Sequence, residues 1–184
     1  MPLDLNSEVL VVRERGGFFF LDDFSLIELS GKDAETFLQG RTSNDVKAVL
    51  AGHGQQTSFL DRKGYLIAFL SIHRIGSNYL LLSDMQQSPV IMKELATYHF
   101  REDISYRETA QDYRALTVHG PIAESFILDN FQLNHVQLSE GNVAQALRSE
   151  HAIVEGTAFG KACRVLRRSI SGDPGFVILV DKGD

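Results

Sequence analysis

The chain has 184 residues, of which 43% are hydrophobic and 23% are charged. This length suits one sizeable domain or two small fused lobes, and this balance is that of an ordinary globular protein with a buried core. The formal net charge is −6. Because binding to phosphates requires a concentrated positive surface, the charge argues against nucleic acid as a partner.

The cysteine count and the apolar runs indicate the cellular compartment. Cys163 is the only cysteine, which excludes an intrachain disulfide, and its apolar neighbours predict a small buried hydrophobe. The first residues lack the basic region and the long apolar stretch of a signal peptide, and no apolar run approaches the length of a membrane span. The sequence therefore predicts a cytoplasmic protein that has no membrane-spanning part.

The first half predicts a mixture of short strands and helices. Strands are expected at residues 9–12, 18–21 and 26–29, and Ser30 is expected to cap a helix through Ala34, Phe37 and Leu38. A β-meander is expected from residue 57 to residue 82, with tight turns at 61–64 and 75–78. A further helix is expected to open at Ser88, ahead of a proline.

The second half repeats the first. Residues 27–37 read IELSGKDAETF and residues 116–126 read LTVHGPIAESF, each a strand that leads through glycine into an amphipathic helix. Residues 63–67 and 174–178 are interpreted as a second, shorter match. A chance likeness is the alternative, and the length of the first match argues against it. The pattern predicts an α+β fold of two similar lobes of antiparallel sheet plus helices, at 1–110 and 111–184, with a ligand cleft between them.

Familiar catalytic patterns are absent from the sequence. The six histidines form no H-x-x-x-H pair, and no Cys/His spacing suits zinc. There is no phosphate-binding glycine loop and no nucleophile elbow. The residues alone thus predict a two-lobed α+β protein with a central ligand site, without naming its chemistry.

One segment resembles a known family. Residues 37–46 read FLQGRTSNDV, which resembles the F-L-Q-G-x-x-[TS]-N-D-V signature of YgfZ proteins, shared in looser form by glycine-cleavage T-proteins. Residues 52–60, 61–64 and 116–123 resemble further segments of the same folate-binding aminomethyltransferase family. The resemblance implies two lobes and a C-terminal barrel around a tetrahydrofolate cavity. T-proteins transfer an aminomethyl carbon to tetrahydrofolate, whereas YgfZ proteins support iron–sulfur enzymes.

A first departure from the family concerns its carboxylate. T-proteins carry paired aspartates shortly after the hairpin glycine, where this chain has Ile67, Ala68 and Phe69. An apolar side chain can neither accept a proton nor stabilise a cationic centre. We therefore expect no aminomethyltransferase activity.

A second departure concerns the pterin contacts. Ile170 and Val177 stand where the resemblance places a tyrosine and a glutamate, so any binding of tetrahydrofolate is expected to be weak. Ser71, His73 and Asp84 are the polar residues expected to line the remaining folate site. The alternative for Ser71 and His73 is that they point to solvent.

A third departure is the absence of the C-terminal barrel and of the K-G-C-[YF] motif of YgfZ proteins. The chain is therefore expected to be either a fragment of a longer protein or a naturally short member. We expect the uncovered face to bind the missing C-terminal domain, a protein partner or a second copy, and the strands expected at 159–166 and 176–180 are the candidates. The sequence predicts a YgfZ-like helper of iron–sulfur enzymes. The alternatives are an interaction subunit similar to the gamma subunit of heterotetrameric sarcosine oxidase and, third, an aminomethyltransferase.

Overall fold

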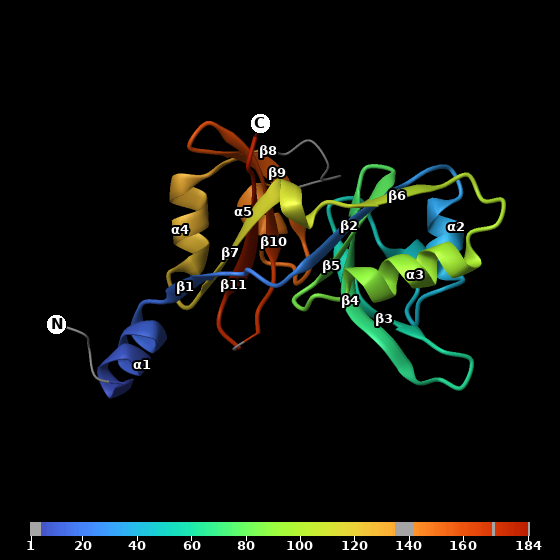
Figure 1. Cartoon of the computed structure of the whole chain (residues 1–184). Helices are drawn as coiled ribbons and strands as arrows, with labels where there is room; N and C mark the ends of the chain where they lie inside the picture. Colours follow the sequence, from blue (N-terminus) through green and yellow to red (C-terminus); the bar gives the residue numbers. More distant parts are fainter. Residues whose placement is uncertain (1–4, 135–141, 171, 184) are drawn as a thin grey trace. The chain divides into compact units, whose positions relative to one another are not determined.

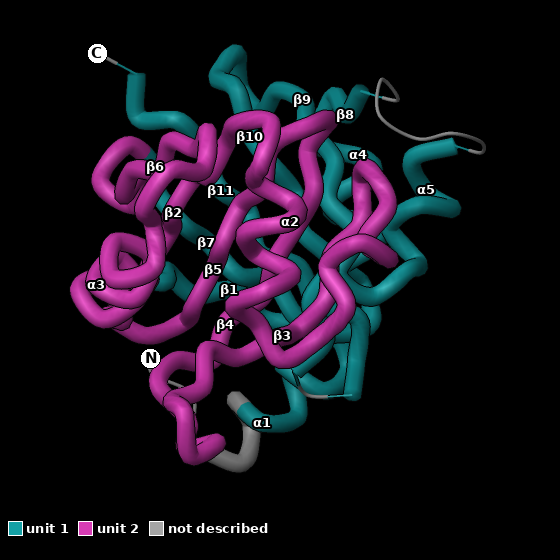
Figure 2. Tube along the Cα trace, turned by 90° about the vertical axis from the view of Figure 1, so that its right-hand side faces the viewer, with its two compact units in different colours: residues 1–22, 113–184 teal, residues 23–112 magenta. Residues whose placement is uncertain are grey.

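The computed structural model describes residues 5–134, 142–170 and 172–183, which form strands and short helices (Figure 1). The chain divides into two compact units, coloured separately in Figure 2. Unit 2 is residues 23–112, and unit 1 combines residues 1–22 with residues 113–184. The junction at 112/113 is close to the expected one at 110/111. The first 22 residues, however, join the second half, because their strand pairs there.

Unit 2 is a five-stranded antiparallel sheet with the strand order β3-β4-β5-β2-β6. Helices α2 and α3 pack on one face of this sheet, where Phe37, Leu38, Ile91 and Leu95 join the buried side chains of the strands. The elements of unit 2 are β2 (Ser25–Ser30), α2 (Ala34–Gln39), η1 (Val46–Ala48), β3 (Gly54–Leu60), β4 (Leu66–Ile75), β5 (Asn78–Ser83), α3 (Ser88–Tyr98), β6 (Ser105–Glu108) and η2 (Ala110–Asp112).

Unit 1 is a six-stranded antiparallel sheet with the order β1-β7-β11-β10-β9-β8. Helix α4 supplies Ala123 and Ile127 to the core on one face of this sheet, against Val165, Phe176 and Ile178. The elements of unit 1 are α1 (Leu5–Glu14), β1 (Gly17–Phe20), β7 (Tyr113–His119), α4 (Ala123–Asn130), β8 (Gln132–Asn134), α5 (Val143–Ala146), β9 (Ile153–Ala158), β10 (Lys161–Arg167) and β11 (Gly175–Asp181).

The two units share one topology, which confirms the predicted α+β fold of two similar lobes. The order β3-β4-β5-β2-β6 of unit 2 corresponds to β9-β10-β11-β7-β1 of unit 1, which has the additional strand β8 beside β9. Gly31 and Gly120 occupy equivalent places after β2 and β7, with φ values of +120° and +117°. A side chain at Gly31 would overlap the backbone of Asp103, and one at Gly120 would overlap Gly16. Each glycine thus allows the edge strand to approach closely.

The second, shorter sequence match does not join equivalent strands. Residues 63–67 lead into β4, whereas residues 174–178 lead into β11, which corresponds to β5. A tight turn before an apolar strand recurs in many β-hairpins, so its sequence does not identify the strand that follows.

Three local expectations were wrong. Residues 9–12 lie in helix α1, because their strand propensity is a weak preference that the surrounding structure overrides. The residue before α2 is Asp33 instead of Ser30. Phe159 lies in a turn with Gly160, at φ values of 52° and 79°, and this two-residue turn with positive φ connects β9 to β10 as a hairpin.

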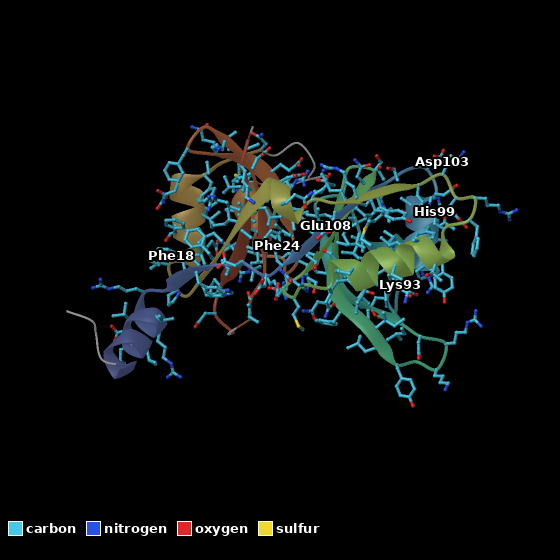
Figure 3. The ribbon with its side chains drawn as sticks, viewed as in Figure 1. Phe18, Phe24, Lys93, His99, Asp103 and Glu108 are labelled. Atoms are coloured by element: carbon cyan, nitrogen blue, oxygen red, sulfur yellow. The ribbon has the colours of Figure 1, made fainter. Side chains whose placement is uncertain are left out.

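The exposed apolar surface also differs from the prediction. Strand β11 is buried at residues 176–179, and in β10 Cys163, Val165 and Leu166 are buried, so these strands offer no open face. Exposed phenylalanines lie instead on β1, where Phe18, Phe19 and Phe20 are 71%, 51% and 60% exposed; Figure 3 labels Phe18. Among the helices of the described residues, none has the length and apolarity needed to cross a membrane.

Candidate functional site

Ser71 and His73 form a buried polar pair on β4. Their side chains are only 4% and 2% exposed, which contradicts the alternative that they point to solvent. The Ser71 Oγ lies 2.9 Å from the His73 Nε2 and is 3.4 Å from the Leu82 carbonyl oxygen on β5. A hydrogen bond between buried polar groups fixes both side chains, because an unpaired group would lose its hydration without compensation.

The neighbouring strand β3 has a glycine opposite His73, which leaves space for the imidazole. Gly54 on β3 pairs with His73 across the sheet, and a Cβ at Gly54 would come within 2.5 Å of the His73 Nδ1. Leu70 and Ile72 belong to the core beneath α2 and α3. Because side chains alternate along a strand, Ser71 and His73 face the opposite side of the sheet.

Asp84 follows β5 directly and is half-buried. The Ser71 hydroxyl donates to the carbonyl oxygen of Leu82, which lies on β5 two residues before Asp84. The three predicted residues therefore come from adjacent parts of one sheet, Ser71 and His73 within β4 and Asp84 beyond the end of β5. Whether they bind folate stays a prediction.

The segment that the resemblance aligns with the family's carboxylates occupies the first half of β4. Ala68 is buried in the core of unit 2 and Ile67 packs against it. Phe69 is 42% exposed, and its backbone N–H donates to the Gln87 Oε1 at 3.2 Å. This half of β4 presents hydrocarbon side chains and no proton acceptor at residues 67–69.

A second hydroxyl–histidine pair, which the sequence analysis did not predict, lies in unit 1. The Thr117 Oγ1 and His119 Nε2 are hydrogen-bonded on β7, and the His119 ring stacks on Phe19 with ring centres 6.1 Å apart. Gly175 pairs with His119, and a Cβ there would overlap the imidazole. The only signal in the sequence was the same spacing, a hydroxyl residue two positions before a histidine.

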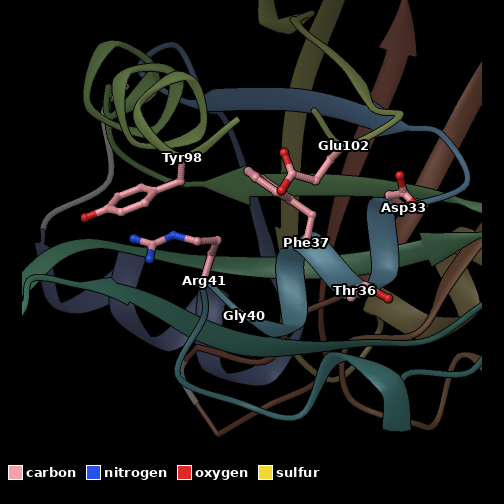
Figure 4. Close-up of a pocket in the computed structure, with 7 residues that line it drawn as sticks. All are labelled: Asp33, Thr36, Phe37, Gly40, Arg41, Tyr98 and Glu102. Carbon is pink, nitrogen blue, oxygen red and sulfur yellow. The ribbon is translucent and has the colours of Figure 1, made fainter. Parts of the chain in front are cut away.

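A separate pocket opens beside α2 and α3 in unit 2, with a volume of about 300 Å³. Figure 4 shows the Arg41 guanidinium and the Tyr98 ring facing one another at one end and the carboxylates of Glu102 and Asp33 toward the other, with the Phe37 ring between. Sequence reasoning missed this pocket. Its lining residues are Asp33, Thr36, Phe37, Gly40, Arg41, Tyr98 and Glu102.

Charged groups in this pocket are held firmly. The Arg41 guanidinium carbon lies 3.3 Å from the centre of the Tyr98 ring, and the guanidinium pairs with Glu94 on α3. The Glu102 carboxylate accepts hydrogen bonds from the backbone N–H groups of Phe100 and Arg101 at 2.9 and 3.0 Å. These bonds lower the pKa of Glu102 to about 2, so the carboxylate is ionised near neutral pH.

Cys163 is a buried free thiol in the described part of the chain. Burial raises the pKa of the Cys163 thiol to about 11, which suits the predicted structural role. Among the described residues, no group of three or more His, Cys, Asp and Glu side chains is placed to hold a metal ion. The two polar pairs and the pocket are therefore the candidate functional features of the described residues.

The two α+β units with one shared strand order define a protein built from a duplicated antiparallel module. The chain belongs to the family of the GCVT N-terminal domain, whose profile matches residues 3–184. It is 29% identical over 191 residues to an aminomethyltransferase of Bacillus subtilis and 25% identical over 192 residues to a probable aminomethyltransferase of Natronomonas pharaonis. These matches cover 100% and 98% of this chain but 49% of each relative, so the chain spans about half their length.

Solved structures show the same fold. The glycine cleavage system aminomethyltransferase T from Bartonella henselae superposes with a TM-score of 0.74 at 19% identity, covering 95% of this chain and 44% of that one. Heterotetrameric sarcosine oxidase from Corynebacterium sp. U-96 superposes with a TM-score of 0.62 at 11% identity, covering 89% and 74%. The chain thus has the T-protein-like folate-binding fold, as predicted. The family is shown, whereas the YgfZ branch within it stays a prediction.

Proposed function

We propose that the chain is a cytoplasmic, tetrahydrofolate-binding-type protein of the YgfZ kind that assists iron–sulfur enzymes and has no aminomethyltransferase activity of its own. The observation that supports the lack of this activity is that Ile67, Ala68 and Phe69 on β4 carry only hydrocarbon side chains. General acid–base chemistry requires a group that exchanges a proton within hydrogen-bond reach of the reacting atom. The family resemblance puts that group in this segment, where the chain has none.

Weak folate binding follows from the remaining polar groups. Ser71 and His73 already satisfy one another, and Val177 is buried where the resemblance puts a pterin-binding glutamate. A polar ligand that loses its partners binds less tightly, since each unpaired buried group carries a desolvation cost. Asp84, half-buried beyond β5, is the carboxylate that we assign to the ligand.

Two assays test this function. The first combines the protein with lipoylated carrier protein and tetrahydrofolate and measures aminomethyl transfer. We expect none, and turnover that a substitution in this chain abolishes would refute the proposal. The second is a calorimetric titration with tetrahydrofolate, for which we expect a Kd above about 1 μM, or less than about 8 kcal/mol of binding free energy. Asp84→Ala should weaken any binding, whereas Asp173→Ala on an exposed turn should not.

The helper role requires a cellular test. Deleting the gene should lower the activity of iron–sulfur enzymes while the amounts of these enzymes stay unchanged, and the wild-type gene should restore it. If the Asp84→Ala gene also restores the activity, the role is independent of folate. If it does not, the role is linked to folate. Unchanged iron–sulfur activities in the deletion strain would overturn this part of the proposal.

The exposed phenylalanines of β1 favour a second candidate, an interaction subunit. Phe18, Phe19 and Phe20 lie on a strand at the end of the sheet order, and large exposed apolar side chains at a sheet edge are typical of pairing surfaces. Sarcosine oxidase, one of the solved structures with this fold, is a heterotetramer. Light scattering across a concentration series tests association, and Phe19→Lys should reduce it.

A further inference from the structure

Strand β1 has an open edge. It pairs with β7 through residues 17–20, and no strand of the described residues lies on its other side (Figure 1). All three of its phenylalanines are more than half exposed. An open edge is a template for pairing with another chain, and natural edge strands usually carry charged residues that prevent such pairing.

The equivalent edge strand of unit 2 has such charges. β6 occupies the same place in its sheet as β1 does, and it reads SYRE, with Arg107 and Glu108 in the strand. β1 reads GFFF and contains no charged residue. Because β6 shows that the shared module does not require phenylalanine at this edge, the apolar sequence of β1 points to a partner.

The hydrogen bonds to β7 show which backbone groups of β1 are open. Opposite residues of an antiparallel pair alternate between hydrogen-bonded and non-hydrogen-bonded pairs. The Leu21 N–H donates to the Ala115 carbonyl oxygen at 3.0 Å, which sets the phase of this alternation. Phe19, two residues earlier, therefore bonds to β7. The N–H and C=O groups of Phe18 and Phe20 point to the open edge.

The side chains of β1 divide between the two faces of the sheet. Phe18 and Phe20 lie opposite Val118 and Leu116, which belong to the core beneath α4, so both phenylalanines extend this core beyond its last strand. Phe19 lies on the other face. The open backbone groups and the larger part of the exposed apolar surface thus belong to the same two residues.

We propose that β1 pairs with β1 of a second copy of this chain, antiparallel and about a two-fold axis at Phe19. This proposal deepens the interaction-subunit candidate above and rests on it. Phe18 of each copy then lies opposite Phe20 of the other, and their open backbone groups form four hydrogen bonds across the axis. The same surface serves on both copies, as a two-fold interface requires.

Charge and area favour a second copy as the occupant. Residues 13–15, two arginines and one glutamate, precede β1, and two aspartates follow it at 22 and 23. Antiparallel pairing brings the basic end of one strand to the acidic end of the other, which orients the copies. At about 150 to 250 Å² per phenylalanine, the exposed fractions supply roughly 300 to 450 Å² of apolar surface per copy. A stable interface buries about 800 Å² per partner, so we expect a weak, reversible dimer.

Cysteine cross-linking of the whole chain tests the strand and its register together. Phe19→Cys places two thiols at the axis in a non-hydrogen-bonded pair, with Cα atoms about 4.5 Å apart, which a disulfide can span. Phe18→Cys is the matched control, because its two Cα atoms lie about 8 Å apart. In a glutathione buffer we expect a linked dimer from the first variant alone. Wild type should give none, because its Cys163 is buried. No cross-link at position 19, or equal cross-linking at both positions, would overturn the proposal.

Amide exchange and sedimentation measure the association without added cysteine. We expect a Kd of roughly 10 to 100 μM, as for a small interface. Protection of the Phe18 and Phe20 amides should rise with protein concentration, whereas that of Phe19, already bonded to β7, should not change. Phe18→Lys should raise the Kd about tenfold or more. Slow exchange of Phe18 and Phe20 at every concentration would show that another segment covers the edge, and would overturn the pairing.

These experiments separate the pairing from the functions proposed above. Association without a cross-link at position 19 would refute this pairing and leave the interaction subunit standing. The folate titration and the deletion strain do not depend on association, so a protein that passes both while sedimenting as a monomer at every concentration would refute the pairing alone.

Discussion

The two units of the molecule have one topology but different side chains at their helices. Both place a strand, a glycine with positive φ and a helix in the same order, and the sheet continues in the same strand sequence. The backbone around this step is also repeated: the Asp33 N–H donates to the Asp103 carbonyl oxygen, and the Ile122 N–H donates to that of Arg15. The glycine, the strand order and the backbone hydrogen bond that both units share are therefore the features that the module needs in order to fold.

What only one unit has is a better guide to function. The positions that give unit 2 its pocket are Asp33, Gly40 and Arg41, and the equivalent residues in unit 1 are Ile122, Asp129 and Asn130. Asp33 and Ile122 have nearly the same backbone, with φ and ψ of −96° and 2° against −91° and 0°. Helix formation thus does not require the Asp33 carboxylate, which instead accepts the backbone N–H of Asp103 at 2.7 Å and holds the segment before β6.

The largest effect should come from the glycines that both units share. Gly31→Ala and Gly120→Ala combine a strained φ with overlap against the backbone of the neighbouring segment, and each should lower the free energy of unfolding by roughly 2 to 6 kcal/mol. Gly76→Ala, with φ of +61° and open space around it, should cost only about 1 to 2 kcal/mol. Urea unfolding measures all three variants. If Gly76→Ala lowered the free energy of unfolding as much as the other two, the close approach of the backbone at Gly31 and Gly120 would not explain their effect.

Equivalent core positions should have nearly equal effects. Leu81 pairs with Ile27, and Ile178 pairs with Leu116 at the matching place in unit 1. Both side chains are fully buried, so Leu81→Ala and Ile178→Ala should each cost about 2 to 5 kcal/mol. Hydrogen exchange of each variant, compared with wild type, will show whether protection falls within the substituted unit. A cost below about 1 kcal/mol in one unit would show that the two cores are not equivalent.

A smaller effect is expected at the two hydroxyl–histidine pairs. Ser71→Ala and Thr117→Val each remove a buried hydroxyl that bonds to an imidazole, and each should cost about 1 to 3 kcal/mol of unfolding free energy. Thermal unfolding measures this cost. If Ser71→Ala left stability unchanged but weakened tetrahydrofolate binding, the pair in unit 2 would be a ligand site, unlike its counterpart in unit 1.

A still smaller effect is expected on the stability of the protein at low pH. The pKa of Glu102 in the folded protein is about 2, below the ordinary value of 4.5, so its stabilising contribution is present above pH 4.5 and is lost as the pH falls toward 2. Glu102→Gln should reduce the dependence of unfolding on pH in this window. Urea titrations at pH 5, 4 and 3 provide the test, and an unchanged slope would show that the backbone bonds do not hold this carboxylate in solution.

Unit 1 should respond at the opposite end of the pH scale. Burial raises the pKa of Cys163 to about 11 from an ordinary 9.0, so the thiol's contribution to stability is present below pH 9 and is lost as the pH rises toward 11. Alkylation by iodoacetamide at pH 8 should be slow in the folded protein and fast in urea. Rapid labelling of the folded protein would indicate that β10 opens readily.

The sequence predicted those parts of the fold that the backbone geometry constrains most. Gly31 and Gly120 recur because no side chain fits there, and the repeated strand and helix followed directly from them. Val9 to Val12 were misread as a strand, because helix α1 is set by its context and not by the β-branched side chains. Phe159 was misplaced because a large apolar residue in a turn with positive φ contradicts the usual preference.

Prediction of the sites was less complete. Ser71 and His73 were expected from the family resemblance, and their alternation along β4 places both on one face of the sheet, while their role in folate binding stays a prediction. The pocket unites residues 33–41 with residues 98 and 102, and only tertiary packing brings those segments together. Arg41 lies within the family signature at a position that the signature leaves open, and its contact with Tyr98 lay beyond any local pattern.

During synthesis of this protein, strand β1 leaves the ribosome long before the strand with which it pairs. β1 ends at Phe20, and its partner β7 begins at Tyr113, so the whole of unit 2 is translated between the two. At about 5 to 20 residues per second, β1 waits roughly 5 to 20 seconds for its partner. During this interval its three phenylalanines are available to chaperones and to other nascent chains, whereas unit 2 already contains every strand of its own sheet. Slowed translation after residue 112 should therefore increase misassembly of unit 1 and leave unit 2 intact.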